Sequence, residues 1–473
     1  MNKAERNHCL KMVYSLWKLI KELAGLIVLS MVFVKKIGIM LSIVLVVLLL
    51  IVLIIIEILM WWKNSFIMNE SSIYHQEGLL NIKKTDILFE RINTVDISQD
   101  VLQRIFNVAT VKIDTGYAKE KSELKIMLNK DRALEIKMKL LNNVTTESME
   151  MAEEKEHFQE NNNYTICKKD LFIYSIISDS ALKGLALLFV VYNFFDRYLN
   201  KVINIDTSRY AKNFESGNYY YKIYLLVGLF FIIMIISVCL SLGYNILKYY
   251  NFKMVAEEKK IDLSYGAIST KNYSFTRKKI KGIYIKQTLL MQFFGYFTLE
   301  IESIGYGNEN GEKSILYPIC NKNTKDDIVA KLFKEFQYKG AKNHPPKNAY
   351  FGFFYKKIIF GIIVTTICFF IKIKILFVFC FIMFVLLLII GCLEFKNTFF
   401  GMDENLVYIC GGSFNKVESI MKMKTIQSVK MSYSYFQYKK GICNYNIMLY
   451  SATFGKELKI RNISDRVTEK DFR

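Results

Sequence analysis

Long apolar runs alternate along the chain with polar segments whose hydrophobic residues recur every second position. The run Ile37–Met60 contains one charged residue, Glu57, and is long enough to cross the hydrocarbon core of a bilayer. Trp61, Trp62 and Lys63 follow it directly, in the way that aromatic and basic anchors mark a membrane interface. We therefore predict a transmembrane helix over this run.

Further apolar runs combine with this one into pairs. The pairs are residues 22–34 with 37–60, 181–195 with 224–244, and 358–371 with 375–393. One run of each pair is marginal in length, but its long partner needs a return crossing if the polar segments share one side of the membrane. We predict three transmembrane hairpins, at residues 15–62, at 171–245 with a polar loop at 196–223, and at 355–394.

The polar segments after the hairpins repeat one another. Aligned at Gln99, Gln287 and Tyr433, they match without a gap over about forty residues. Apolar residues recur in register at Ile73/Ile261/Val407, Ile87/Phe275/Met421, Ile92/Ile280/Ile426, Val95/Ile283/Val429, Ile97/Ile285/Met431, Leu102/Leu290/Phe436, Val111/Leu299/Tyr445 and Ile113/Ile301/Ile447. Residues that accept positive φ recur at Gly78/Gly266/Gly412 and Asn107/Gly295/Gly441. The repeat predicts three equivalent modules.

The two-residue spacing within each module predicts half-buried antiparallel strands. The stretch SQDVLQRIFNVATVKIDTG, residues 98–116, is typical of a small hairpin that turns at Asn107. A helix is predicted to follow the strands, with Leu134, Met138 and Leu141 on one face in the first copy. In the second copy the corresponding apolar residues are Ile328, Leu332, Phe333 and Phe336. The third copy reaches Arg473 where this helix would begin, so we expect its helix to be truncated.

These patterns predict an integral membrane α+β protein in which three transmembrane helical hairpins alternate with three antiparallel β modules, each capped by a C-terminal helix. We expect the modules at residues 63–141, 246–339 and 395–473. The acidic segment 142–170 is predicted to be a solvated linker, and residues 340–354 a stiffer one that contains Pro345 and Pro346.

The Trp61-Trp62 exit, the strand pair around Gly78 and the segment ERINTVDISQDVLQRIFNVATVKIDTG resemble the bacterial pleckstrin-homology (PH)-like "membrane-flanked domain" proteins of the YdbT-like group. The resemblance covers nearly the whole chain. It implies PH-like modules made of two near-orthogonal antiparallel sheets capped by a helix, and it implies little about activity. The third copy departs from the pattern, since Tyr433 replaces the glutamine and Lys440 replaces Phe106 and Phe294, so a site built on that glutamine is in doubt.

The net charge of +21 favours anionic partners, and lysines clustered beside the apolar runs favour lipid headgroups over nucleic acid. Basic residues on the module side slightly outnumber those at the hairpin tips. This bias indicates a multi-pass protein of the bacterial plasma membrane with cytoplasmic modules. Nine scattered cysteines without a C-x-x-C pair fit a reducing compartment. The four histidines stand far apart, and we predict neither a metal site nor a cofactor.

Few residues invite a functional interpretation. The recurring glutamine most simply satisfies nearby backbone groups. Glu57 is an intramembrane acid, which is a functional candidate by default, but it lies close enough to Trp61 to reach the interface. The basic run Arg277, Lys278, Lys279 and Lys281 could bind lipid headgroups or simply face water.

No phosphate loop, zinc-protease motif or nucleophile elbow is present, so we predict a non-enzymatic protein. The leading hypothesis is a membrane-associated scaffold or sensor whose modules bind a partner protein, each other or lipid headgroups. The alternative is a six-span transporter or channel with accessory cytoplasmic domains. The scarcity of charge within the spans weighs against that alternative.

Overall fold

The computed structural model describes residues 4–19, 21–22, 39–92, 94–115, 124–146, 162–178, 219–257, 260–303, 315–370, 374–449 and 457–465. All structural statements below concern these residues. The predicted runs 22–34 and 181–195 lie outside them apart from residue 22, as do most of the acidic linker, most of the loop 196–223 and the site of the third C-terminal helix.

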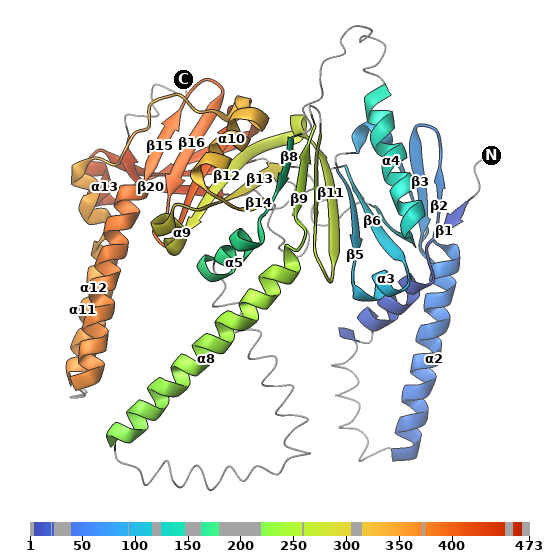
Figure 1. Cartoon of the computed structure of the whole chain (residues 1–473), viewed down its shortest axis with the longest axis horizontal. Helices are drawn as coiled ribbons and strands as arrows, with labels where there is room; N and C mark the ends of the chain where they lie inside the picture. The colour runs from blue at the N-terminus through green and yellow to red at the C-terminus, as the bar shows by residue number, and fades with distance from the viewer. Residues whose placement is uncertain are drawn as a thin grey trace.

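The order of the elements confirms the threefold repeat (Figure 1). The first copy contains β2 (Ser65–Met68), β3 (Ser72–Glu77), β4 (Lys83–Leu88), η1 (Phe89–Arg91), β5 (Thr94–Gln99), α3 (Val101–Ile105), β6 (Val108–Asp114), β7 (Leu124–Asn129) and α4 (Lys130–Thr146). The second contains β9 (Lys253–Ala256), β10 (Lys260–Tyr265), β11 (Thr270–Thr276), η2 (Arg277–Lys279), β12 (Ile280–Thr288), α9 (Leu289–Phe294), β13 (Phe297–Ser303), β14 (Ile315–Cys320), α10 (Lys322–Leu332) and η3 (Lys334–Phe336). The third contains β15 (Phe399–Met402), β16 (Leu406–Gly411), β17 (Asn415–Lys422), η5 (Met423–Thr425), β18 (Ile426–Ser432), α13 (Tyr435–Lys439), β19 (Ile442–Leu449) and β20 (Glu457–Ser464).

The two recurring turn positions adopt the predicted backbone conformation. Gly78, Gly266 and Gly412 have φ values of 107°, 114° and 104° and turn the chain between the second and third strands of each module. Asn107, Gly295 and Gly441 have φ values of 53°, 72° and 62°. The positive φ predicted at both positions is therefore confirmed.

The connection from the fourth to the fifth strand differs from the tight hairpin predicted for residues 98–116. A short helix, α3, fills it, and Asn107 turns the chain after that helix. Asp100 caps the helix and forms a capping box with Gln103. The alternating apolar residues around Asn107 obscured this helix-start signal. Leu102, which recurs in apolar register, therefore lies on an exposed helix and not in a strand.

The sheets continue from one module into the next. One sheet has the order β7-β6-β5-β11-β10-β9-β8, and another has the order β14-β13-β12-β17-β16-β15. The fourth strand of each of the first two modules thus pairs antiparallel with the third strand of its successor, as β5 with β11 and β12 with β17. The remaining sheets, β1-β2-β3-β4 and β18-β19-β20, lie at the two ends of this array.

A segment ahead of each predicted hairpin pairs with the first module strand that follows the hairpin. β1 (Glu5–Arg6) pairs with β2, and β8 (Asn162–Thr165) pairs with β9. In the third copy a bridge joins Asn343 to β15. The residues reached in the three copies are Phe66, Met254 and Phe400, which are equivalent in the repeat. Each predicted hairpin is therefore flanked by two segments that pair with each other, as strands in the first two copies and as an isolated bridge in the third.

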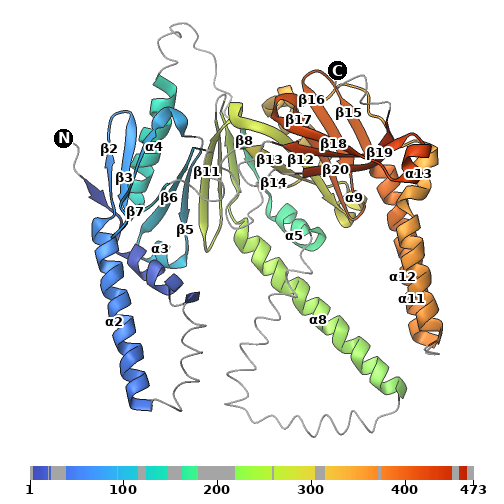
Figure 2. The same cartoon turned by 180° about the vertical axis from the view of Figure 1, so that it is seen from behind.

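Helices project from one side of these sheets in both views (Figures 1 and 2). They are α2 (Ile39–Lys63), α8 (Tyr219–Lys248), α11 (Tyr355–Phe370) and α12 (Lys374–Asn397). Among the described residues, the stretches Lys347–Ile367 and Cys380–Asn397 are long and apolar enough to cross a membrane, and few of their residues are buried. The predicted partners of α2 and α8 fall outside the described residues, so the arrangement as three hairpins stays a prediction.

The C-terminal helices cover the module cores. In the second copy Ile328, Leu332, Phe333 and Phe336 are all buried, as predicted. In the first copy the predicted face is wrong. Leu134 and Met138 are exposed, and α4 buries Ala133, Ile136 and Leu140 instead. Both sets follow helical spacing, so the period alone did not distinguish the two faces.

Candidate membrane-facing site

Each module exposes apolar side chains on the short helix between its fourth and fifth strands. We call α3, α9 and α13 the connecting helices. Their N-caps are Asp100, Thr288 and Ser434, each of which accepts a backbone hydrogen bond from the first helical turn. The exposed apolar residues are Val101, Leu102, Ile105 and Phe106 in or beside α3, Leu290, Phe293 and Phe294 in α9, and Tyr435, Phe436 and Tyr438 in α13. Apolar side chains left in water at three equivalent places indicate a contact surface.

Hydrogen bonds fix each connecting helix to a segment that directly precedes a predicted span. Tyr14 Oη, in a helical segment over residues 10–19, donates to Asp100 Oδ1 at 2.6 Å. Thr288 Oγ1 donates to the Ile177 carbonyl at 2.6 Å. Asn348 Nδ2 donates to the Lys440 carbonyl at 3.0 Å. The three helices therefore lie on the side of the sheets from which the apolar helices project (Figure 2).

The pre-span segments add their own apolar surface beside the connecting helices. In the segment over residues 10–19, Leu10 packs against Val108 and Met127, whereas Val13 and Trp17 are exposed. The corresponding exposed residues elsewhere are Phe172 and Ile176 in α5 (Lys168–Ile177), and Tyr350 and Phe351 in η4 (Lys347–Phe353). Lysines accompany them, including Lys18, Lys168 and Lys347. Apolar and aromatic residues beside lysines are the composition of membrane-interface segments.

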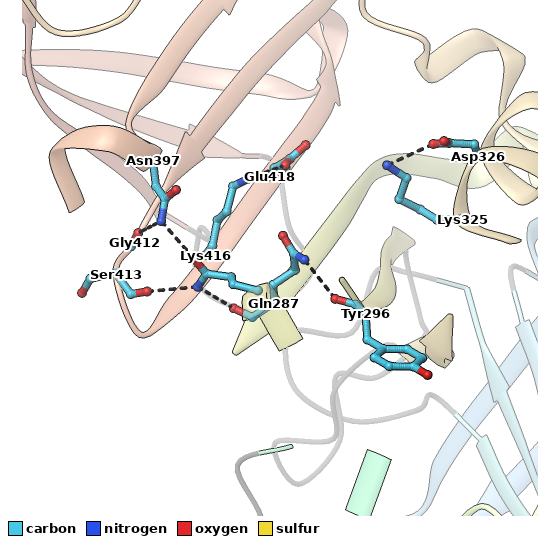
Figure 3. A network of polar contacts seen from close by, with 10 residues as sticks. Gln287, Tyr296, Lys325, Asp326, Asn397, Gly412, Ser413, Lys416 and Glu418 are labelled. Atoms are coloured by element: carbon cyan, nitrogen blue, oxygen red, sulfur yellow. Dashed lines mark hydrogen bonds and ion pairs between the residues drawn. The ribbon is translucent and has the colours of Figure 1, made fainter. Parts of the chain in front are cut away.

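The end of α12 is tied into the joint between the second and third modules. Asn397 Nδ2 donates to Gln292 Oε1 at 3.2 Å and to the Gly412 carbonyl at 3.1 Å, and Gln292 Nε2 donates to the Ser413 carbonyl at 3.0 Å (Figure 3). An apolar helix that is predicted to cross the membrane, a connecting helix and a module turn meet in this network. The orientation of α12 is therefore coupled to the packing of two modules.

Glu57 lies at the equivalent end of α2 and is buried. Its carboxylate accepts a hydrogen bond of 2.8 Å from Ser15 Oγ, so it faces the segment over residues 10–19. A cavity of about 440 Å³ adjoins it. Charged groups line this cavity, namely Glu57, Glu77, Lys11 and Lys83, together with Trp61 and Asn64. Burial lowers the pKa of Lys11, and Glu77 partly offsets this effect. A functional role for Glu57 stays a prediction.

A polar network joins the first module to the end of α2 beside this cavity. Asn64 Oδ1 lies 3.0 Å from His75 Nε2 and accepts a hydrogen bond of 2.9 Å from Asn7 Nδ2. Trp61 Nε1 donates to the Asn7 carbonyl at 2.7 Å. Burial lowers the pKa of His75, Glu77 partly offsets this effect, and the neighbouring Lys11 and Lys83 lower the pKa further. The network therefore holds a neutral imidazole at neutral pH.

The predicted basic run lies at the far end of β11 from the apolar helix α8. The turn before β11 is bonded to α8, since Ala267 N donates to the Leu247 carbonyl at 2.9 Å. Arg277 bonds the Leu332 carbonyl, and Lys279 Nζ donates to Ile92 O of the first module at 2.7 Å. Burial lowers the pKa of Lys281, and Lys278 is exposed. A headgroup role for these residues stays a prediction.

The recurring glutamine satisfies backbone groups. Gln99 Nε2 donates to Val108 O at 2.8 Å, and Gln287 Nε2 donates to Tyr296 O at 3.0 Å (Figure 3). Val108 and Tyr296 are equivalent in the repeat. The two copies thus make the same contact, which ties the end of the fourth strand to the start of the fifth.

The bacterial PH domain family matches the chain three times, over residues 24–144, 210–334 and 358–469. The UPF0699 transmembrane protein YdbT of Bacillus subtilis (strain 168) is 23% identical over 422 residues, which cover 86% of this chain and 83% of that protein. No solved structure gave a significant match. The matches fall on the three modules and their apolar helices, and together they span most of the sequence. The three domain copies, the apolar helices and the transmembrane relative fit a membrane-associated protein, and the chain belongs to the bacterial PH domain family.

Proposed function

We propose that this protein is a non-enzymatic scaffold that holds three PH modules in a fixed orientation against the cytoplasmic face of the plasma membrane. The observation that carries the proposal is the set of three connecting helices. Each exposes apolar side chains, and each is hydrogen-bonded to a segment that enters a predicted span. A row of such contacts would hold the array flat against the bilayer and present its opposite side to partner proteins.

The size of the apolar contribution supports this orientation. Phe293 is 83% exposed, and transferring one such side chain from water to an apolar environment is worth about 1.5–3 kcal/mol. Several of these side chains act together on one rigid array. Pre-span lysines such as Lys18 and Lys168 would each add about 1 kcal/mol near an anionic leaflet.

The proposal is tested by the depth of the second connecting helix. Trp17, Trp61 and Trp62 are replaced by Phe, and Phe293→Trp then supplies the only tryptophan. In vesicles that contain lipids brominated near the headgroup, we expect strong quenching of this fluorescence, because bromine quenches tryptophan on contact. Lys278→Trp is the matched control, since Lys278 is exposed at the other end of β11 and should not be quenched.

The same measurement with Phe106→Trp and Phe436→Trp asks whether all three modules lie on the bilayer. Quenching at all three positions but not at 278 supports the scaffold orientation. Quenching no stronger at these positions than at 278 would contradict it and leave the connecting helices as surfaces for a protein.

A further inference from the structure

The array of modules ends in two unpaired sheet edges. β4, the third strand of the first module, is bonded only to β3 in the described part of the chain, and β18, the fourth strand of the third module, only to β19. Inside the array, strands at these same positions pair with each other, as β5 with β11 and β12 with β17. We call this pairing of a fourth strand with the third strand of the next module a joint. Each end of the array thus carries one of the two strands of such a joint, which the molecule already forms twice.

The two internal joints have the same register. In the first, Val95 lies opposite Ser274 and Ile97 opposite Asn272. In the second, Ile283 lies opposite Ile420 and Ile285 opposite Glu418, and these are the equivalent repeat positions. Register is set by side-chain packing, and a slip of one residue would invert every side chain. The agreement therefore defines one joint geometry. Carried over to the free edges, it places Val429 opposite Asp86 and Met431 opposite Lys84.

A polar contact beside the strands recurs as well. Arg104 of α3 donates to the Ala267 carbonyl, and Gln292 of α9 donates to the Ser413 carbonyl at 3.0 Å. Arg104 and Gln292 are equivalent, as are Ala267 and Ser413. The equivalent residue of the third module is Tyr438, which is 74% exposed. The equivalent carbonyl of the first module is that of Leu79, in the turn before β4.

Apolar side chains at the free edges are more exposed than the equivalent side chains at the internal joints. Val95, Ile97, Ile283 and Ile285 are buried, whereas Val429 and Met431 at the same positions of β18 are only partly buried against the third core. Leu80, next to β4, is 98% exposed, but its equivalents Ile268 and Phe414 at the internal joints are 47% and 52% exposed. Both ends therefore carry apolar surface that a neighbouring module would bury.

We propose that copies of this chain join head to tail, with β18 of one copy pairing with β4 of the next in the register of the internal joints. Strand addition at a sheet edge supplies backbone hydrogen bonds, and the exposed apolar residues add burial. The contact joins two different surfaces, so repeated addition produces a closed ring or an open filament. The internal joints keep every described apolar helix on one side of the sheets, and a joint of the same geometry would do so between copies (Figure 1).

Disulfide trapping tests the proposed pairs in membranes. Cys9 and Cys167, the exposed cysteines outside the apolar helices, are changed to Ser. One tagged copy of the full chain carries Val429→Cys and a second, differently tagged copy carries Asp86→Cys. A parallel experiment uses Lys430→Cys with Thr85→Cys. Neighbouring antiparallel pairs alternate between Cα separations of about 5.5 and 4.5 Å. One of the two tested pairs therefore has the shorter separation, at which the two side chains are closer and a disulfide forms more readily.

We expect an oxidation-dependent product that carries both tags for at least one of the two pairs. The matched control, Val429→Cys with Lys83→Cys, shifts the register by three residues and places the thiols on opposite faces, so it should give at least tenfold less. Absence of the two-tag product in both correct pairs, or equal yield from the control, would overturn the proposal. Capture of a different protein by the Val429→Cys copy, with no two-tag product, would also overturn it and assign the edge to that protein.

Discussion

His75 takes part in the contact between the first module and the end of the apolar helix α2. Its ring meets Asn64, the residue after α2, while Asn64 also accepts a hydrogen bond from Asn7. A protonated imidazole would be costly here, because the side chain is buried and Lys11 and Lys83 lie nearby. Protonation of this one side chain at low pH would therefore weaken the contact between the module and α2.

The sign of the pH dependence follows from the lowered pKa of His75. In the unfolded chain the imidazole takes up its proton near pH 6.5, while in the folded protein it stays neutral to lower pH. Its contribution to stability is therefore full above pH 6.5 and is lost as the pH falls through the lowered folded value. We expect His75→Gln to show a smaller loss of melting temperature between pH 7.5 and pH 5 than the wild type.

Thermal unfolding in nanodiscs at the two pH values measures this difference. His344→Gln is the control, since His344 is exposed in the connector before the third hairpin. The assignment of the acid sensitivity to His75 fails if both variants lose as much stability as the wild type.

At the scale of single elements, the turn between the second and third strands of the third module requires a glycine. Gly412 has a φ of 104°, and a Cβ there would lie 2.0 Å from the Asn415 carbonyl oxygen. Gly411, its neighbour in the same turn, would meet no atom within 4 Å. Substituting each of these adjacent glycines by alanine therefore distinguishes the cost of the turn conformation from the general effect of adding a methyl group.

Gly412→Ala is expected to destabilise the third module by about 2 kcal/mol or more, because the strained φ alone costs about 1–3 kcal/mol and the contact with Asn415 adds to it. Gly411→Ala should change the stability by less than about 1 kcal/mol. Chemical denaturation of the full chain in detergent, followed through the protease sensitivity of the third module, compares the two variants. Equal effects would show that the turn tolerates an L-residue.

The sequence predicted the strands and turns better than it predicted which strands pair with each other. Period-two spacing and the glycine positions sufficed for the strands and turns, because both depend on local geometry. Pairing of β5 with β11 was not predictable, since the alternation along one strand does not encode which edge it meets. The connecting helices were missed for a related reason. Leu102, Leu290 and Phe436 recur in apolar register, which favoured a core position, whereas the structure exposes all three.

At the scale of the whole molecule, chemical labelling of the cysteines can show which side of the membrane the modules face. Cys410 and Cys443 are buried, and burial raises their pKa values to about 12 and about 11. Neither thiol forms the reactive thiolate at neutral pH in the folded protein. Cys9 and Cys167 are exposed and lie just ahead of predicted spans on the module side.

An impermeant maleimide added to intact cells should therefore label none of these four cysteines if the modules are cytoplasmic. After permeabilisation we expect labelling of Cys9 and Cys167, and of Cys410 and Cys443 only after denaturation. Mass spectrometry of the labelled peptides distinguishes the sites. Modification of Cys9 or Cys167 in intact cells would place the modules outside.

The pairing of segments on either side of each predicted hairpin would impose an order on biogenesis. β8 leaves the ribosome long before β9, and if the polypeptide between them inserts as the predicted hairpin, it enters the bilayer before the two strands meet. In that arrangement the module would wait, with its outermost strand already made, until the hairpin has been inserted. The sheet would close last and act as a checkpoint for insertion. A fragment that begins after the hairpin would lack that strand and expose the backbone of β9 to aggregation.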